Sequence, residues 1–173
     1  MFCSGYWHAV CQDSTGRNYA IRSGMMYFKA MFDQGAIPVL EKIISFTEAR
    51  HQVIANNIAN VDTPNYRRRD LPVSEFQHAL SKSIEHRRAT NPRIFDFLAT
   101  DNVAANELGG VTARVLTASP SPLDILRHDN NNVSIDREMS ELAKNTLLHN
   151  GMVQILSKEF QMLGNAISER ITR

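Results

Sequence analysis

The apolar positions of this chain form two long stripes with helical spacing, one towards each end. The first begins at Ile37 and repeats every three or four residues without a break as far as Val61. Alternating steps of three and four mark the seam of a helix that packs against another helix. The seam predicts a helix of about 24 residues, ~36 Å long. Its members are Ile37, Leu40, Ile44, Thr47, His51, Ile54, Ile58 and Val61.

The second stripe runs from Ile135 to Ile167 with the same unbroken alternation. Ser134 is a candidate N-cap, and Asp136 and Glu138 fall in the first turn, where negative charge suits the helix dipole. The stripe predicts a helix of roughly 35 residues, ~50 Å in length. Its members are Ile135, Met139, Leu142, Thr146, His149, Val153, Leu156, Phe160, Leu163 and Ile167.

Thr47 and His51 are polar members of the first seam. One interpretation is that they are tolerated at the edge of a helix contact. The other is that they set the register or the number of partners, as a buried polar seam residue does. The spacing alone leaves both interpretations open.

The stretch between the two stripes has weaker patterns. Leu71–Arg88 predicts a shorter helix in which Ser74 is the N-cap. Residues 89–132 are interrupted by prolines and a Gly-Gly pair, and Val111–Thr117 has partial strand character. This part of the chain is therefore expected to be irregular or partly β.

The first 35 residues give no firm element, because glycines interrupt every period. A short helix over Gly24–Phe32 is compatible with the spacing of Met25 and Phe28. The two cysteines, Cys3 and Cys11, allow a disulfide, a metal half-site or two unpaired thiols, and the absence of a nearby His/Cys cluster favours the thiols. No secretory signal pattern is present in this stretch.

Together the stripes predict a mainly α fold, in which paired N- and C-terminal heptad helices form a helical hairpin or coiled coil around an irregular or partly β insert. The expected segments are an N-terminal extension over 1–35, either disordered or an upstream mis-assigned start, and an N-terminal assembly helix over 36–62. A turn, a short helix and a flexible insert occupy 63–132, and a C-terminal assembly helix occupies 133–173. Apolar positions outside the seams predict self-association.

Composition and charge exclude several classes of function. The chain has 19 basic and 18 acidic residues and a net charge of +1, which gives no case for nucleic acid or an anionic membrane. No run approaches the roughly 18 apolar residues of a membrane span. Catalytic motifs, cofactor sites and small-molecule or metal sites are not predicted. The one basic run, Arg67–Arg69, is interpreted as a solvated or subunit-facing charge run.

The first long helix ends in a well-marked turn. The stretch ANNIANVDTPNY, Ala55–Tyr66, closes the seam with three asparagines and then turns at Asp-Thr-Pro-Asn. Pro64 suits the second position of a turn, and Asn65 tolerates the left-handed conformation that follows it. The asparagines of the motif either supply directional hydrogen bonds that fix register or bond local carbonyls at the helix end.

This motif resembles that of the bacterial flagellar rod and hook proteins, whose N-terminal helices end in ANN-x-AN followed by D-T-P-G-Y. A second block, Asn131–Phe160, resembles the C-terminal helix of the proximal rod branch of that family. Asn65 stands where the family has Gly, and Asn130 stands where it commonly has Gly in D-G-N-N-V. Because Asn is the residue best able to replace Gly at positive φ, both departures support the prediction of a turn at these positions.

The resemblance, which covers Gly35–Arg173, implies a structural subunit of the flagellar basal body rod, placed in the periplasm and exported without a cleaved signal peptide. The implied partners are the chain itself, other rod subunits similar to FlgC, an adaptor similar to FliE, and the flagellar export gate. The implied motif and turn residues are Ala55, Asn56, Asn57, Ile58, Ala59, Asn60, Asp62, Thr63, Pro64, Asn65 and Tyr66. The expected assembly seam comprises Leu40, Ile44, Ile54, Ile58, Met139, Leu142, Val153, Leu156, Phe160, Leu163 and Ile167.

A second hypothesis is a cytoplasmic helical-hairpin adaptor that binds a partner helix. The two hypotheses differ in whether the protein is found in basal bodies. If the seams are assembly surfaces, Ile54→Asp or Leu156→Asp should abolish assembly without affecting expression, because a charge would enter a packed seam. Replacing Arg68 by Ala should matter much less.

Overall fold

The computed structural model describes residues 10–12, 18–20, 35–90, 95–106, 109–118 and 130–168. Cys3 and the short helix considered for Gly24–Phe32 lie outside these residues. Within the N-terminal extension, strands β1 (Val10–Gln12) and β2 (Asn18–Ala20) pair antiparallel.

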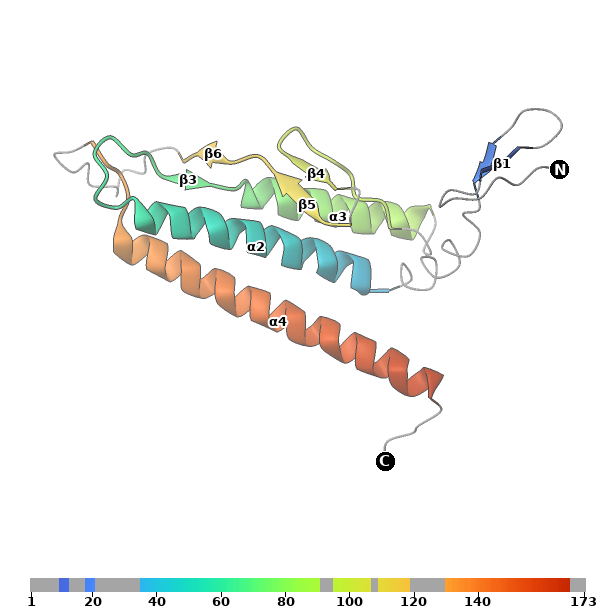
Figure 1. Cartoon of the computed structure of the whole chain (residues 1–173). Coiled ribbons are helices and arrows are strands. Elements are labelled where there is room, and N and C mark those ends of the chain that lie inside the picture. Colours follow the sequence, from blue (N-terminus) through green and yellow to red (C-terminus); the bar gives the residue numbers. More distant parts are fainter. Residues whose placement is uncertain are drawn as a thin grey trace.

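Two long helices run antiparallel along the molecule (Figure 1). Helix α2 spans Ile37–Ala59 and helix α4 spans Ile135–Ile167, so the helices predicted from the two stripes are confirmed. Pro38 fits the first turn of α2, where its missing N–H costs nothing. The helices lie close at the start of α4 and diverge towards its C-terminal end, which extends past the first turn of α2 (Figure 1).

A third helix, α3 (Val73–Ala89), lies on the side of α2 opposite α4 (Figure 1). It begins one residue before Ser74, so the assignment of Ser74 as N-cap is wrong. Pro72 occupies the cap position without a side-chain hydrogen bond, and its carbonyl accepts from the N–H of Phe76 at 3.0 Å. Ser74 is exposed inside the first turn.

The insert contains two small antiparallel strand pairs. Strand β4 (Val103–Ala105) pairs with β5 (Val111–Ala113), and β3 (Arg69–Asp70) pairs with β6 (Leu116–Thr117). The partial strand character of Val111–Thr117 is therefore confirmed, as is the mainly helical fold with its long helices packed together.

The hydrophobic core lies between α2, α3 and the β4–β5 hairpin, and α4 contributes no buried apolar residue to it. The rings of Phe46 and Phe76 stack with their centroids 4.1 Å apart. The buried residues of α4 are Glu138 and Asn145, both of them polar. The two seams therefore do not meet as one continuous apolar strip inside the chain. The core residues are Phe46, Val53, Leu71, Phe76, Val103 and Val111.

None of the described helices is both long enough and apolar enough to cross a membrane.

Candidate functional site

Asn57 of the asparagine motif is the centre of a buried polar network. Its side chain has no exposed surface. Its Nδ2 donates to the carbonyl of Arg69 at 2.6 Å and to Oε2 of Glu138 at 2.9 Å. Its Oδ1 accepts from the N–H of Arg69 and the hydroxyl of Tyr66, both at 3.1 Å. All four bonds that an amide side chain can make are formed, so Asn57 joins the end of α2 to β3 and to the start of α4.

Glu138 carries the negative charge of this network and is itself completely buried. Its Oε1 accepts from Nε of Arg68, which is 6% exposed. The guanidinium of Arg68 also reaches Oδ2 of Asp70 at 3.2 Å. Burial is the largest single influence and disfavours the charged form of Arg68, but the hydrogen bonds and charges of Glu138 and Asp70 together outweigh it and raise the pKa of Arg68.

Arg68 therefore does not belong to a solvated charge run, and that interpretation of the basic run is wrong at this position. Strand β3 begins at Arg69, and side chains along an extended segment alternate in direction. Arg67 and Arg69 are exposed, whereas Arg68 points to the interior. Glu138 lies in the first turn of α4, as the sequence predicts, and it is also the partner of this buried cation.

A second, more exposed set of ion pairs continues along the α2–α4 interface. Arg50 of α2 contacts Oδ1 of Asp70 at 3.3 Å and Oε2 of Glu141 at 3.1 Å. Lys144 reaches the other carboxylate oxygen of Glu141 at 3.0 Å. The hydrogen bond from Lys144 lowers the pKa of Glu141, and the charge of Arg50 adds to this effect against the opposing influence of burial.

Both asparagines that replace family glycines adopt the left-handed conformation. Asn65 has φ of 59° and Asn130 has φ of 54°, which confirms the turn conformations expected from the sequence. The sequence did not reveal the role of the next residue, Asn131. Its Nδ2 contacts the carbonyls of Val61 at 2.8 Å and Thr63 at 3.0 Å, so the segment before α4 caps the end of α2.

The three asparagines of the motif have different roles. Asn57 fixes the register of α2 against α4 within the chain. Asn60 bonds locally, with its Nδ2 donating to the carbonyl of Asn56 at 2.8 Å. The motif residues that are exposed in the chain are Ala55, Asn56, Ala59, Asp62, Thr63, Pro64 and Asn65, while Ile58, Asn60 and Tyr66 are half-buried.

Midway along the two helices, Thr47 makes a polar contact with α4. Its hydroxyl donates to the carbonyl of Ile44 at 2.9 Å, so Nδ1 of His149, 3.0 Å away, is the donor to Oγ1. Nδ2 of Asn145 donates to the carbonyl of Thr47 at 2.8 Å. Thr47 is buried, and within the chain it acts as a register residue.

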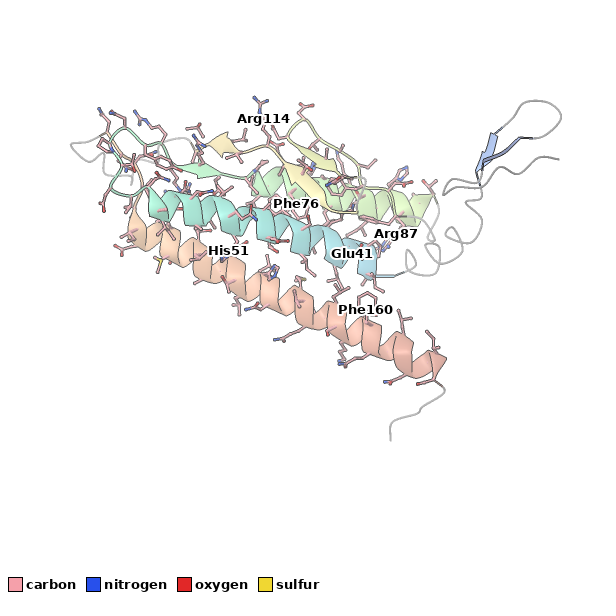
Figure 2. The ribbon with its side chains drawn as sticks, viewed as in Figure 1. Glu41, His51, Phe76, Arg87, Arg114 and Phe160 are labelled. Atoms are coloured by element: carbon pink, nitrogen blue, oxygen red, sulfur yellow. The ribbon has the colours of Figure 1, made fainter. Side chains whose placement is uncertain are left out.

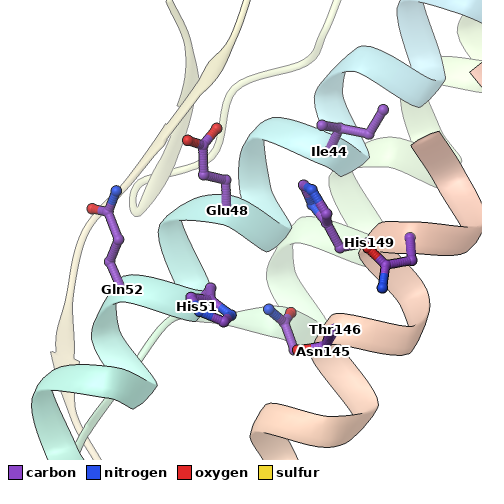
Figure 3. A pocket seen from close by; sticks show the side chains of 8 residues that line it. Ile44, Glu48, His51, Gln52, Asn145, Thr146 and His149 are labelled. Atoms are coloured by element: carbon purple, nitrogen blue, oxygen red, sulfur yellow. The ribbon is translucent and has the colours of Figure 1, made fainter.

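The other polar seam residue, His51, is exposed and lines an open groove of about 580 Å³ between α2 and α4, which His149 lines from the opposite helix (Figure 3). Among the described residues, no group of three or more His, Cys, Asp or Glu is arranged to hold a metal ion. Within the same residues, every buried side-chain nitrogen and oxygen has a hydrogen-bond partner.

The predicted assembly seam divides into buried and exposed parts. Leu40 and Ile54 are buried. Among the seam positions of α4, exposure reaches 53% at Met139 and 78% at Ile167. Figure 2 shows side chains projecting along the whole of α4, with Phe160 near its C-terminal end. The half-buried members are Ile44, Ile58, Leu142, Leu156 and Leu163, and the remaining exposed members are Val153 and Phe160.

A second apolar stripe lies beside the seam on α4, among the apolar positions outside the seams that the sequence analysis noted. Leu148, Ile155 and Met162 follow one another at seven-residue intervals and are 45%, 45% and 50% exposed. Leu147 beside them is 77% exposed. We call Leu148, Ile155 and Met162 the outer stripe. Leu148 also lines a mainly apolar cavity of about 190 Å³ with Phe76, so the stripe begins where α2, α3 and α4 meet.

Comparisons with known proteins identify relatives of this chain. A family model described as "Flagella basal body rod protein" matches residues 47–67, which include the whole of the asparagine motif and its turn. The flagellar basal body rod protein FlgB of Bacillus subtilis is 31% identical over 136 residues, covering 78% of this chain and 94% of the relative. FlgB of Aquifex aeolicus is 31% identical over 78% of this chain and 94% of its own length. FlgB of Escherichia coli is 29% identical, with coverage of 76% and 92%.

Proposed function

Because the chain belongs to the FlgB family of flagellar basal body rod proteins, we propose that it builds the rod by packing α4 against neighbouring copies. Members of this family are structural subunits of the basal body rod, so the chain is a structural protein of the flagellum and not an enzyme. Its place is in the rod, where it is assembled with other rod components. Self-assembly and the surface that performs it belong to the proposal.

The outer stripe is the observation that carries this proposal. Exposed apolar residues that repeat along one face of a helix are typical of a surface that contacts another protein. Fully burying one Leu, Ile or Met side chain is worth about 1.5–3 kcal/mol, so covering the stripe with a neighbour gives a substantial driving force. A contact between this stripe and a different surface of the next copy is heterologous. Such contacts build an open helical array when the rotation from one copy to the next does not close the copies into a ring.

The buried network supports this function by fixing the direction of α4. The fully buried residues of α4 are polar, so its apolar side chains do not by themselves set a register against α2. Directional bonds from Asn57 to Glu138 and from Asn145 to the carbonyl of Thr47 define one register instead. The outer stripe is then presented on a helix whose first half is held in place by the chain itself.

The position that we propose within the flagellum is supported by the sequence resemblance. The block Asn131–Phe160 supports a place in the proximal rod, within the periplasm. Its neighbours there would be rod subunits similar to FlgC, an adaptor similar to FliE and the flagellar export gate, with export that uses no cleaved signal peptide. The competing proposal is a cytoplasmic adaptor that uses the same stripe to bind a partner helix.

The decisive experiment replaces one residue of the outer stripe in a strain that depends on this chain for swimming. Ile155→Asp puts a charge on a 45% exposed position, so the subunit should fold and accumulate normally. We expect loss of swimming and loss of the protein from purified basal bodies, because the charge would have to be buried in the contact. Gln154→Asp, at the adjacent exposed position, is the matched control and should assemble.

Normal incorporation of the Ile155→Asp protein into basal bodies would contradict the assembly surface. Absence of the unsubstituted protein from basal bodies, with the whole pool in the cytoplasm, would favour the adaptor instead.

A further inference from the structure

A small cavity reaches the hydrophobic core where α2, α3 and α4 meet. Its volume is about 190 Å³ and its lining is mainly apolar. The stacked rings of Phe46 and Phe76 form part of its wall. Leu148 of α4 also lines it and is 45% exposed, so the cavity is accessible from the surface beside α4. The polar lining residues are Thr47, Arg50, Gln77 and Asn145.

The face of α4 that lines this cavity continues as the outer stripe. Asn145, Leu148 and Met152 line the cavity and are spaced three and four residues apart. Ile155 and Met162 follow at intervals of three and seven, so all five residues share one helical face. The first part of this face borders α2 and α3 across the cavity, whereas Ile155 and Met162 are 45% and 50% exposed. One face of α4 therefore carries a hollow and, further along, projecting apolar side chains.

We propose that Met162 of a neighbouring copy inserts into this cavity, which is then the surface that receives the outer stripe. The inference rests on the proposed function, because it names the second half of the contact that builds the rod. The cavity and Met162 are different parts of the subunit, so the contact is heterologous. The first copy keeps its own cavity and the second keeps its own Met162, and further copies add in the same way.

The size of the cavity fits one long aliphatic side chain. An apolar cavity of about 150 Å³ accepts a molecule as large as benzene. A cavity of about 190 Å³ is therefore large enough for the side chain of one methionine. Side chains that fill an apolar pocket away from water carry much of the binding energy of an interface.

Among the residues of the outer stripe beyond the cavity, Met162 has the chemistry that suits the cavity wall. Methionine is unbranched and flexible, and its sulfur makes favourable contacts with aromatic rings. The rings of Phe46 and Phe76 supply such partners. Ile155 is branched at Cβ and stiff about its first side-chain torsion, so it adapts less easily to a cavity that other side chains have shaped.

Met162 cannot reach the cavity of its own chain. Met152 is the last α4 residue in the cavity wall, and Met162 lies ten positions further along, which is ~15 Å of helix. Helix α4 is continuous from Ile135 to Ile167, so it does not fold back. A disulfide needs Cα atoms within about 7 Å of each other. A disulfide from position 162 to the α3 side of the cavity would therefore have to join two copies.

Cysteine cross-linking in purified basal bodies tests the insertion. In a Cys3→Ser/Cys11→Ser background, Met162→Cys is combined with Gln77→Cys, an exposed residue of α3 that lines the cavity. The control combines Gln77→Cys with Gly164→Cys, on the opposite side of α4, where an added Cβ meets nothing within 4 Å. Under mild oxidation, we expect the first pair to give disulfide-linked dimers and longer chains at least about tenfold faster than the control.

Two results of the cross-linking would overturn the proposal. One is an equal rate of disulfide formation in the two pairs, because the cavity would then show no preference for position 162. The other is efficient dimer formation by a variant whose only cysteine is Ile155→Cys. Such dimers would place two outer stripes against each other about a two-fold axis, which closes the contact and leaves no stripe for the cavity.

The shape of the side chain at position 162 provides a measurement that needs no disulfide. Met162→Ala removes the inserted group and should lower the amount of the protein in basal bodies at least about tenfold. Met162→Leu keeps an apolar side chain of similar volume and should be incorporated nearly as well as the unsubstituted chain. Both variants should keep the helical circular dichroism signal, because position 162 is 50% exposed.

Comparison with Ile155→Asp separates the two proposals. Normal incorporation of Met162→Ala, together with loss of Ile155→Asp from basal bodies, would reject insertion into the cavity and leave the outer stripe as the assembly surface. Normal incorporation of both variants would reject both the insertion and the assembly surface.

Discussion

Arg68 and Glu138 are separated by seventy positions in the chain and form an ion pair with almost no solvent contact. Arg68 lies between the end of α2 and strand β3, and Glu138 lies in the first turn of α4. Taking two charges out of water is costly, and their attraction compensates only when the geometry and the remaining hydrogen bonds are good. Asn57 completes that geometry by donating to the second carboxylate oxygen of Glu138.

Removing one member of this pair should strongly destabilise the fold. Arg68→Ala leaves the carboxylate of Glu138 buried without its cation, which should lower the free energy of unfolding by about 3–5 kcal/mol. Arg67→Ala, one residue away and exposed, should change it by no more than about 0.5 kcal/mol. Urea unfolding followed by circular dichroism measures both. This prediction replaces the expectation that Arg68→Ala is mild, and similar values for the two variants would show that the pair is dispensable.

Asn57 and Asn56 should respond very differently to the same change. Asn57→Ala leaves several buried partners without a hydrogen bond, including the hydroxyl of Tyr66 and Oε2 of Glu138. Each unsatisfied buried group costs about 1–3 kcal/mol, so the unfolding midpoint should fall clearly. Asn56→Ala removes an exposed side chain from the same turn of helix and should have little effect. A thermal unfolding comparison in which Asn56→Ala is the more destabilised protein would refute the assignment of the register residue.

The left-handed conformation of Asn65 predicts how strongly different substitutions at this position should destabilise the fold. Gly should be tolerated there, because it adopts positive φ without a steric cost. Ala and Val should destabilise by about 1–2 kcal/mol, since their Cβ atoms clash in this conformation. The φ of Asn65 is 59°, and its side chain is exposed, so packing contributes little to the comparison. Equal free energies of unfolding for the Gly and Val variants would rule out a left-handed residue in the turn.

The ion pairs of Glu141 predict a dependence of stability on pH. The pKa of Glu141 is lowered in the folded chain, chiefly by Lys144 and then by Arg50. A group with a depressed folded pKa stabilises the fold above its unfolded pKa, and this contribution is lost as pH falls through the folded value. The unsubstituted chain should therefore be more stable than Glu141→Gln at neutral pH, and the difference should shrink in acid. A difference that grows on acidification would reverse the sign and contradict the ion-pair geometry.

Substitutions at Ile54 and at Ile155 should distinguish an effect on folding from an effect on assembly. Ile54 is completely buried, so Ile54→Asp should prevent stable folding and reduce the amount of soluble protein. This prediction replaces the expectation that Ile54→Asp leaves expression unaffected. Ile155→Asp should retain the helical circular dichroism signal of the unsubstituted chain. Soluble, folded Ile54→Asp protein would mean that the fold does not depend on an apolar side chain at this buried position.

Much of the fold was predictable because it depends on local periodicity. The steps of three and four residues located α2 and α4, since a helical face repeats at that interval wherever it occurs. The left-handed turns at Asn65 and Asn130 were predictable for a similar reason, because the preference belongs to the residue itself. The start of α3 was missed, since Pro72 and Ser74 are both acceptable near a helix start and packing decides between them.

The asparagine motif shows which properties of individual residues the sequence could not determine. The sequence by itself established that Ala55–Tyr66 ends a long helix in a turn, and the resemblance of that motif indicated the family. It did not distinguish Asn57 from Asn56 and Asn60, nor Arg68 from the arginines on either side. Only the tertiary structure brings Glu138 to these two residues. Burial of a polar group depends on what lies opposite it in space, and a partner seventy or more positions away leaves no trace in a local pattern.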